Sequence, residues 1–267
     1  MRFAALLIFS FLVSACAAQP VASRKLVGDE SNNSSSTNKT PILVELFTAE
    51  GCSSCPPAEK ILAKLQLEQP FEKVEVITLA LHVDYWDGLG WRDKFASPLH
   101  TQRQSVYDRK FRTGRIYTPQ MIVDGDTEFV GSDFGKAEKA ITKAIKAEKA
   151  DLRLSIEEDK LRIFISNIPK HDQSTVYLAL AEDDLSSDIR GGENAGKNLT
   201  HVSVVRRLKA LDRLEATQIS FEIEVPVQIA EDWKRENLNV IVFIQENKSR
   251  RILGVGRNGF RSEIASD

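Results

Sequence analysis

The chain has 267 residues, with 36 basic and 38 acidic side chains and a formal net charge of -2. Hydrophobic residues make up 42% of the sequence and charged residues 28%, which excludes a disordered chain and is typical of a folded globular protein. The sequence contains no long run of Lys or Arg, so its charge pattern indicates no nucleic-acid partner.

The first residues of the chain have the build of an export signal. Arg2 is followed by an apolar run over residues 3–13 and then by small residues, and the run is too short for a membrane span. Its end, LVSAC, resembles the lipobox of bacterial lipoproteins, in which the cysteine, here Cys16, is acylated. A simple signal peptide cut nearby is the alternative. We expect residues 1–16 to direct export to the bacterial envelope, with a periplasmic protein anchored by a lipid on Cys16.

A polar segment follows the expected signal. Residues 17–40 include SNNSSSTNKT, are poor in aromatic side chains and show no apolar period. This composition predicts a flexible tether rather than part of a core. At the other end, residues 261–267 are expected to form a short tail, which leaves 41–260 as the folded part.

The first half of the folded part alternates between short apolar runs and helical spacings. ILVELF reads as a buried strand, and Ala58, Ile61, Leu62 and Leu65 fall on one face of a helix. The expected order is strand, helix, strand, helix, strand, strand and helix. The first strand is expected at 42–47, and the first helix has Pro56 and Pro57 in its first turn. The later elements are expected at 74–84, 97–111, two strands within 120–131, and 133–150.

The second half, from residue 151 to 260, consists of short segments with period-two alternation separated by turn-forming residues. Six or so such strands in this length predict a small β-sandwich. The segment 202–214 differs, because its apolar spacing favours a helix. The Gly- and Asn-rich segment 189–201 is expected to be a long loop, and covering the active site is an alternative role for it.

Two cysteines stand between the first strand and the first helix. If the helix begins there, Cys52 lies at its N-terminus, where unpaired N–H groups and the helix dipole stabilise a thiolate. Cys55 lies one turn deeper and is placed to attack a mixed disulfide formed at Cys52. The spacing therefore predicts a redox-active disulfide Cys52–Cys55 that needs no organic cofactor. A structural disulfide is the alternative, although closing so small a loop removes little chain entropy.

A metal site is the other alternative for the same cysteines. Zinc would normally need four ligands, and the sequence has no second Cys-x-x-Cys. Copper needs fewer, since thiolates with one imidazole suit Cu(I), and His82 follows a strand that could end near Cys52 and Cys55. A copper-binding module or metallochaperone is therefore the main rival to redox chemistry. A non-catalytic envelope interaction protein is a further rival.

The segment HVDYWDGLGW places two tryptophans directly after a strand. Trp86 and Trp91 could line a hydrophobic groove beside the cysteines that accepts an extended substrate chain. The alternative is that they only cover the sheet. Asp84 and Asp87 invite a carboxylate-hydrolase interpretation, but turn or capping roles are favoured for them.

The arrangement of strand ILVELF, turn TAEG, CSSC opening a helix, and YTPQMIV before a hairpin resembles the thioredoxin-like superfamily. The resemblance implies a thioredoxin-like fold for 41–150. It also implies that Pro119, preceded by Thr118, has a cis peptide bond and that this pair binds the substrate backbone. Glu45 matches the buried acid that takes the proton from the resolving thiol in that superfamily.

More narrowly, FTAEGCSSCPPAE, HVDYWDGLGW and YTPQMIVDG resemble an uncharacterised family of bacterial secreted proteins, catalogued as domain of unknown function 1223. We therefore expect an α/β thioredoxin-like domain at 41–150 followed by a β-sandwich-like C-terminal domain at 151–260. The expected activity is thiol–disulfide exchange with a protein or small thiol outside the cytoplasm, recharged by a redox partner.

Overall fold

The structure is a computed structural model that describes residues 39–260. The expected signal with Cys16, nearly all of the expected tether and the tail at 261–267 lie outside the described residues. Within 39–260, no helix is long and apolar enough to cross a membrane.

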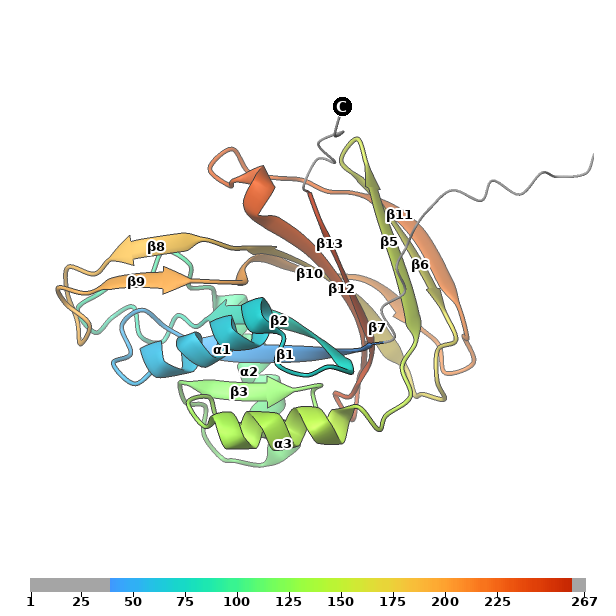
Figure 1. The fold of residues 1–267 in the computed structure, drawn as a ribbon, viewed down its shortest axis with the longest axis horizontal. Helices are drawn as coiled ribbons and strands as arrows, with labels where there is room; N and C mark the ends of the chain where they lie inside the picture. The colour runs from blue at the N-terminus through green and yellow to red at the C-terminus, as the bar shows by residue number, and fades with distance from the viewer. Residues whose placement is uncertain (1–38, 261–267) are drawn as a thin grey trace, which may run out of the picture. The chain divides into compact units, whose positions relative to one another are not determined.

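The described residues form α-helices, one short 3-10 helix and a larger number of β-strands (Figure 1). The helices are α1 (Pro56–Glu68), α2 (Pro98–Phe111), α3 (Phe134–Ala144) and the 3-10 helix η1 (Arg235–Asn237). The strands are β1 (Thr40–Thr48), β2 (Val74–His82), β3 (Gln120–Val123), β4 (Thr127–Val130), β5 (Asp151–Glu157), β6 (Lys160–Ser166), β7 (Ser174–Glu182), β8 (Leu185–Asp188), β9 (Asn198–His201), β10 (Val204–Leu214), β11 (Phe221–Pro226), β12 (Leu238–Glu246) and β13 (Ile252–Gly259).

Eight of these strands form one mixed sheet, in the order β13-β12-β7-β10-β2-β1-β3-β4. Strand β10 lies parallel to β2, where Val204 pairs with Ala80, and the Ala80 N–H donates to the Ser203 carbonyl at 2.8 Å. Strands from both sides of residue 150 therefore belong to one sheet. The expected fold class, an α/β thioredoxin-like domain followed by a separate β-sandwich-like domain, is wrong, because the chain is mostly β and its two halves share this sheet.

Both faces of the main sheet are covered. On one face, Phe47 of β1 packs with Tyr107 of α2, their rings 6.1 Å apart. On the other face, Val44 of β1 packs in a cluster with Leu62 of α1 and Ile141 of α3. Because both faces are buried, β1 is apolar along nearly its whole length rather than alternating.

A second, three-stranded sheet in the order β11-β6-β5 covers part of the main sheet. Its buried residues Leu161, Ile163 and Ile165 pack in one cluster with Val176 and Leu178 of β7. The alternation of β6 follows from this arrangement, since one side of the strand faces the cluster and the other faces solvent.

The prediction of a helix at 202–214 is wrong. Most of this segment forms the long strand β10. Its pairing with β7 is interrupted by register shifts between Val205 and Arg207 and between Ala210 and Asp212. Such bulges change which face the following residues occupy. The period-two pattern of β10 is therefore hidden in the sequence.

The carboxyl ends of β1 and β2 set the position of the functional residues. The two strands run parallel, and Thr48 at the end of β1 pairs with His82 at the end of β2. The β8–β9 ribbon reaches the same edge, because His201 at the end of β9 bonds to Glu59 of α1, 142 positions earlier in the sequence.

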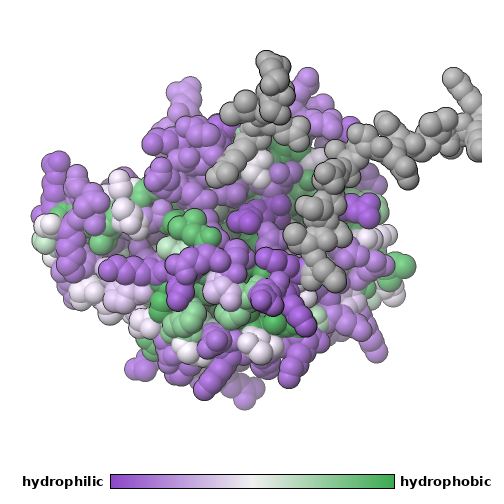
Figure 2. All heavy atoms as spheres, viewed as in Figure 1, coloured by the Kyte–Doolittle hydropathy of each residue, from purple (hydrophilic) through white to green (hydrophobic). Residues whose placement is uncertain are grey.

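The described surface is mostly hydrophilic. Figure 2 shows one face with small green apolar patches among purple side chains. The exposed large apolar side chains come from different elements and loops, and they are Leu67, Leu89, Leu99, Val130, Phe164 and Ile219. The apolar groups are thus scattered over the surface.

Candidate functional site

The two cysteines lie in the connection between β1 and α1, in the segment 51–55, which we name the cysteine turn. Cys52 and Cys55 form a disulfide with Cα atoms 5.4 Å apart, and both residues are fully buried. Helix α1 begins at Pro56 with Cys55 as its N-cap residue, so the helix begins after the cysteines rather than at Cys52. The Ser54 Oγ lies 3.4 Å from the Cys52 sulfur.

The segment 189–197 covers the cysteine turn, and we name it the cover loop. The buried Asn194 amide donates to the carbonyls of Glu50 and Cys52 at 2.8 and 2.9 Å. The exposed Glu193 carboxylate accepts from the backbone N–H and the hydroxyl of Ser53, at 3.0 and 2.6 Å. The alternative role considered for this loop, covering the cysteine pair, therefore matches its position.

A close backbone contact fixes the other end of the cover loop. A Cβ atom added at Gly191 would lie only 2.2 Å from the Gly90 carbonyl oxygen. The two chain segments can approach this closely only because residue 191 has no side chain. The cover loop thus packs directly on the loop that follows β2.

Thr118 and Pro119 lie close to the cysteine turn, and their peptide bond is cis. The Trp86 indole donates to the Thr118 hydroxyl at 2.8 Å. A Cβ added at Gly51 would lie 3.6 Å from the Trp86 side chain, which places Trp86 between the cysteine turn and Thr118. The structure therefore brings together Trp86, Thr118 and the cysteine turn, and their role in binding substrate stays a prediction.

Trp91 bonds to the interior through its indole, and its expected role in lining a groove beside the cysteines stays a prediction. Its indole N–H donates to Oε2 of the fully buried Glu50 at 2.7 Å. Its polar atom is thus directed to an interior carboxylate. Trp91 helps to hold the buried residues described below.

Glu45 has its own buried partners. Its carboxylate accepts from Arg103 at 2.5 and 3.1 Å and from the Tyr107 hydroxyl. Burial raises the pKa of Tyr107 well above its ordinary value. The described hydrogen bonds of Glu45 include none to a cysteine, so its role as a proton relay stays a prediction.

A second group of polar residues lies at the ends of β2 and β9, and we name it the histidine cluster: Glu50, Glu59, His82, Asp93 and His201. All are buried except Glu59, which is partly buried. His82 Nδ1 lies 2.6 Å from Asp93 Oδ2. The same carboxylate accepts the backbone N–H of Glu50 at 2.9 Å. Burial alone would raise the pKa of Asp93. His82 and the backbone N–H groups of Glu50 and Phe95 outweigh this effect and lower that pKa to about 2.

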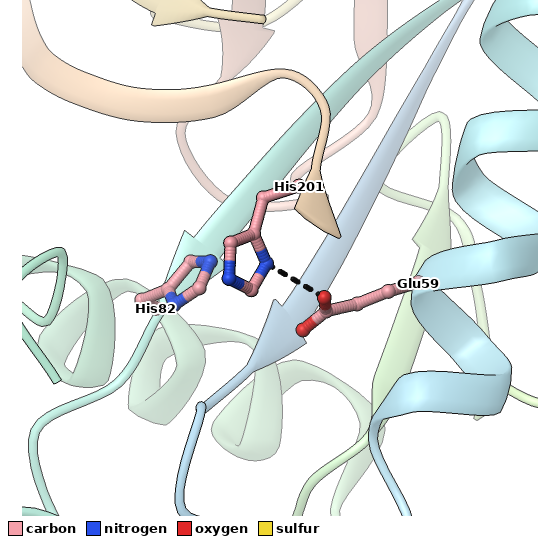
Figure 3. Close-up of side chains that lie close together, drawn as sticks. All are labelled: Glu59, His82 and His201. Carbon is pink, nitrogen blue, oxygen red and sulfur yellow. Dashed lines mark hydrogen bonds and ion pairs between the residues drawn. The ribbon is translucent and has the colours of Figure 1, made fainter. Parts of the chain in front are cut away.

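His201 lies between two carboxylates of this cluster. Its Nδ1 is 2.7 Å from Glu59 Oε2, and its Nε2 is 3.3 Å from Glu50 Oε1. Burial disfavours a charge on His201, but the two carboxylates outweigh this effect and raise its pKa to about 9. The rings of His82 and His201 are 5.1 Å apart and nearly perpendicular. Figure 3 shows them side by side, with Glu59 beyond His201.

The copper ligand set considered from the sequence, Cys52, Cys55 and His82, stays a prediction. Within residues 39–260, one group of ligand-type atoms lies within 4.8 Å of one another, and it comes from Glu59, His82 and His201. Neither Cys52 nor Cys55 belongs to this group. Sequence reasoning missed Glu50, Glu59, Asp93 and His201, because they lie far apart in the chain and form no local motif. The available signal was that His82 and His201 each follow an apolar or alternating run.

Comparison with known proteins places the chain in a family. The profile described as Protein of unknown function (DUF1223) matches residues 43–245, which confirms the family resemblance expected from the sequence. No curated protein sequence matches the chain significantly.

One solved structure is similar over most of the chain. The crystal structure of protein AGR_C_4864 from Agrobacterium tumefaciens has 25% identity and a TM-score of 0.69, covering 84% of this chain and 96% of that one. A domain of the outer membrane lipoprotein Omp28 from Porphyromonas gingivalis has 13% identity, covers 42% of this chain and 94% of its own, and has a TM-score of 0.23. Superoxide reductase from Nanoarchaeum equitans has 11% identity, covers 42% and 91%, and has a TM-score of 0.22. The last two overlaps are too weak to support an argument.

Proposed function

The chain belongs to the DUF1223 family of proteins of unknown function, and we propose that it is a thiol–disulfide exchange protein acting through Cys52 and Cys55. The observation that carries the proposal is that these cysteines are paired immediately before the first turn of α1. The N–H groups of that turn and the helix dipole favour a thiolate in the reduced protein. The two cysteines are only three positions apart in the sequence, so as a structural disulfide they would add little to the stability of the fold.

The reaction is a pair of sulfur displacements. In the reduced protein, the Cys52 thiolate attacks one sulfur of a substrate disulfide, and the other substrate sulfur leaves as a thiolate that takes a proton from solvent. The Cys55 thiolate then attacks the Cys52 sulfur and releases the second substrate sulfur. The substrate disulfide is reduced to a dithiol while Cys52 and Cys55 are oxidised to the disulfide, and the reverse sequence oxidises a substrate dithiol.

Substrate docking is assigned to the surface beside the cysteine turn. Thr118 and Pro119 border it, and Trp86 links Thr118 to Gly51. An extended substrate chain could bond to the backbone at Thr118 while its sulfur approaches Cys52. Trp91 supports this surface from the inside through Glu50.

Exchange requires the cover loop to move. Cys52 and Cys55 are fully buried, and a thiolate must reach the Cys52 sulfur in line with the disulfide. The Glu193 contacts to Ser53 are exposed to solvent, so they can be exchanged for water at little cost. Local opening of this loop is therefore the step that admits substrate.

The proposed location is the bacterial envelope, where disulfides persist. It rests on the signal-like start of the chain and on the lipobox-like sequence at Cys16. The partners are then a thiol or disulfide substrate and a second redox partner that restores the pair.

A trapping experiment with the full chain tests the proposal. Cys55→Ser is expressed in a bacterium with its own export segment, quenched in acid, alkylated and separated without reductant. Because the resolving thiol is missing, mixed disulfides through Cys52 should accumulate and disappear on reduction. Intact-mass measurement detects adducts with small thiols in the same sample.

The controls are Cys52→Ser and the double variant Cys52→Ser/Cys55→Ser, which should form no such adducts. A Cys55→Ser protein that is folded by circular dichroism yet carries no adduct, with either protein or small thiols, would count decisively against exchange chemistry.

A further inference from the structure

A pocket of about 230 Å³ lies between helix α2 and the main sheet. Both α2 and three neighbouring strands, β7, β10 and β12, contribute to its walls, and the turn between β12 and β13 adds Arg250. Its apolar lining includes Leu99, Val106, Tyr177 and Leu208. None of these residues belongs to the cysteine turn, the cover loop or the histidine cluster, so neither of those sites accounts for the pocket.

The pocket is apolar because α2 covers the sheet incompletely. The buried residues of α2 are His100, Gln104 and Tyr107, and most of its other side chains are polar. Tyr177 of β7 and Leu208 of β10 therefore stay only partly buried. Leu99, which also lines the pocket, is 57% exposed. An apolar group placed here would remove these side chains from water, which is favourable.

The floor of the pocket is rigid, and its charge is already balanced. The rings of Tyr177 and Phe243 stack with their centroids 5.1 Å apart. The Arg103 guanidinium lies 5.2–5.4 Å from the ring centroids of Tyr107, Tyr177 and Phe243. Its positive charge is paired with the buried Glu45 carboxylate at 2.5 Å. Arg103 therefore shapes the floor and offers no free charge to a ligand.

Arg250 differs from Arg103 in this respect. The hydrogen bonds and ion pairs within residues 39–260 include none made by the Arg250 guanidinium, although the residue is partly buried. Burial lowers the pKa of Arg250, and the nearby positive charge of Arg103 acts in the same direction. Both effects show that the protein supplies too little negative charge around this side chain. An anion beside Arg250 would correct this.

The backbone holds Arg250 in place at the pocket. The buried Gln245 amide donates to the Arg250 carbonyl at 2.8 Å. A Cβ atom added at Gly125 would collide with the same carbonyl, so the chain can approach there only because residue 125 is glycine. The pocket thus presents an unpaired guanidinium on a fixed backbone next to an apolar wall.

We propose that this pocket binds a small monocarboxylate with an apolar body about as large as a benzene ring. The carboxylate pairs with the planar fork of Arg250, which matches its two oxygens, and the apolar body lies against Leu99, Tyr177 and Leu208. The pocket, at about 230 Å³, is smaller than the roughly 300–1,000 Å³ of sites for drug-sized ligands. Its apolar wall disfavours strongly hydrated anions such as phosphate, which would lose water without enough new partners.

This inference goes beyond the proposed exchange function and does not depend on it. No cysteine lines the pocket, and the binding proposed here involves no redox step. Failure of the Cys55→Ser trapping experiment would leave the carboxylate site untouched, and absence of carboxylate binding would leave the exchange proposal untouched.

The test is a titration of the purified protein with benzoate at constant pH and ionic strength, followed by the backbone amide signals in NMR spectra. We expect saturable binding with a Kd of about 1 mM or lower. The shifted signals should come from α2 and from the β12–β13 turn. Benzamide has the same ring without the charge, so it should bind at least about 10-fold more weakly.

Variants separate the charge from the apolar wall. Arg250→Gln should weaken benzoate binding at least about 10-fold and change benzamide binding by less than about twofold, because only the charged bond is lost. Leu208→Ala should weaken both ligands about threefold, since it removes apolar contact. The matched control is Arg115→Gln, at an exposed arginine whose hydrogen bonds come from its backbone, and it should bind both ligands like the wild type.

Circular dichroism establishes that each variant is folded, and the comparison of benzoate with benzamide in the wild type requires no variant. The proposal would be overturned by wild-type protein that does not bind benzoate at about 10 mM, or by equal affinities for benzoate and benzamide. Benzoate-induced shifts confined to other parts of the protein would also overturn it. So would a folded Arg250→Gln protein that binds benzoate as tightly as the wild type.

Discussion

The cysteine turn and the histidine cluster lie near the same edge of the main sheet, but they are held there by different kinds of contact. The cysteine turn is covered by a loop whose Glu193 bonds to Ser53 are exposed to solvent. The histidine cluster is held by His82 at the end of β2 and by carboxylates that water hardly reaches. We expect the first site to open locally and the second to open only when the sheet is disturbed.

This difference matches the proposed exchange function. Disulfide exchange needs a partner sulfur to reach Cys52, so a cover that moves is an advantage. The protein thus combines a movable cover with a fixed cluster of charged side chains. The Asn194 amide contacts both, because it bonds to the carbonyls of Glu50 and Cys52.

The largest predicted effect comes from removing a carboxylate of the fixed centre. Asp93→Ala leaves His82 Nδ1 and the backbone N–H groups of Glu50 and Phe95 without their acceptor. We expect the free energy of unfolding to fall by about 3 kcal/mol, measured by urea denaturation with chelator present. The exposed Asp188→Ala should change it by less than about 0.5 kcal/mol. A loss below about 1 kcal/mol for Asp93→Ala would show that the cluster is not fixed.

The next effect tests the link between the two centres. Asn194→Ala removes the donor that joins the carbonyls of Glu50 and Cys52. Because this amide is fully buried, we expect a loss of about 2 kcal/mol in unfolding free energy and faster reduction of the disulfide by dithiothreitol. Asn198→Ala, whose amide bonds to the exposed Asp188, is the control and should leave both unchanged. An unaltered reduction rate in Asn194→Ala would separate the cover loop from access to the disulfide.

Disturbing the cover loop at its far end should expose the cysteines. In Gly191→Val the new Cβ would lie 2.2 Å from the Gly90 carbonyl oxygen, so the loop cannot dock as before. We expect the disulfide to be reduced about tenfold faster, which corresponds to about 1.4 kcal/mol in the opening equilibrium. Gly88→Ala adds a methyl group that meets nothing within 4 Å and serves as the matched control. Equal rates for Gly191→Val and the wild type would refute gating by this loop.

The smallest effect is expected at the exposed contact. Ser53→Ala removes the hydroxyl bond to Glu193 but keeps the backbone bond. Reduction should accelerate by no more than about threefold, since the contact competes with water. A tenfold or larger change would mean that this exposed contact, rather than Asn194, holds the loop closed.

The parts of the fold that sequence reasoning predicted are those set by neighbouring residues. The strand before Cys52 and the helix after it were both expected, because the apolar run and the helical spacing are continuous there. A helix was also expected at 97–111, and α2 begins there with Pro98 in its first turn and the Ser97 hydroxyl accepting from the Leu99 N–H. These features depend on local capping and periodicity.

The parts that could not be predicted depend on long-range pairing. Within the main sheet, the two halves are joined where Val204 of β10 pairs with Ala80 of β2, and bulges in β10 hide its alternation. The histidine cluster likewise joins His201 to Glu59 over 142 positions. No local pattern carries such contacts, whereas the cysteine pair is visible because it spans three positions.

The measurement that tests the central claim most directly is the reduction potential of the Cys52–Cys55 pair in the purified protein, by equilibration with glutathione buffers. Thiol–disulfide exchange proteins have potentials of about -270 to -120 mV, whereas structural disulfides of secreted proteins lie below about -300 mV. We predict a value within the first range. A value below about -300 mV would identify the pair as a structural disulfide and contradict the proposed exchange function.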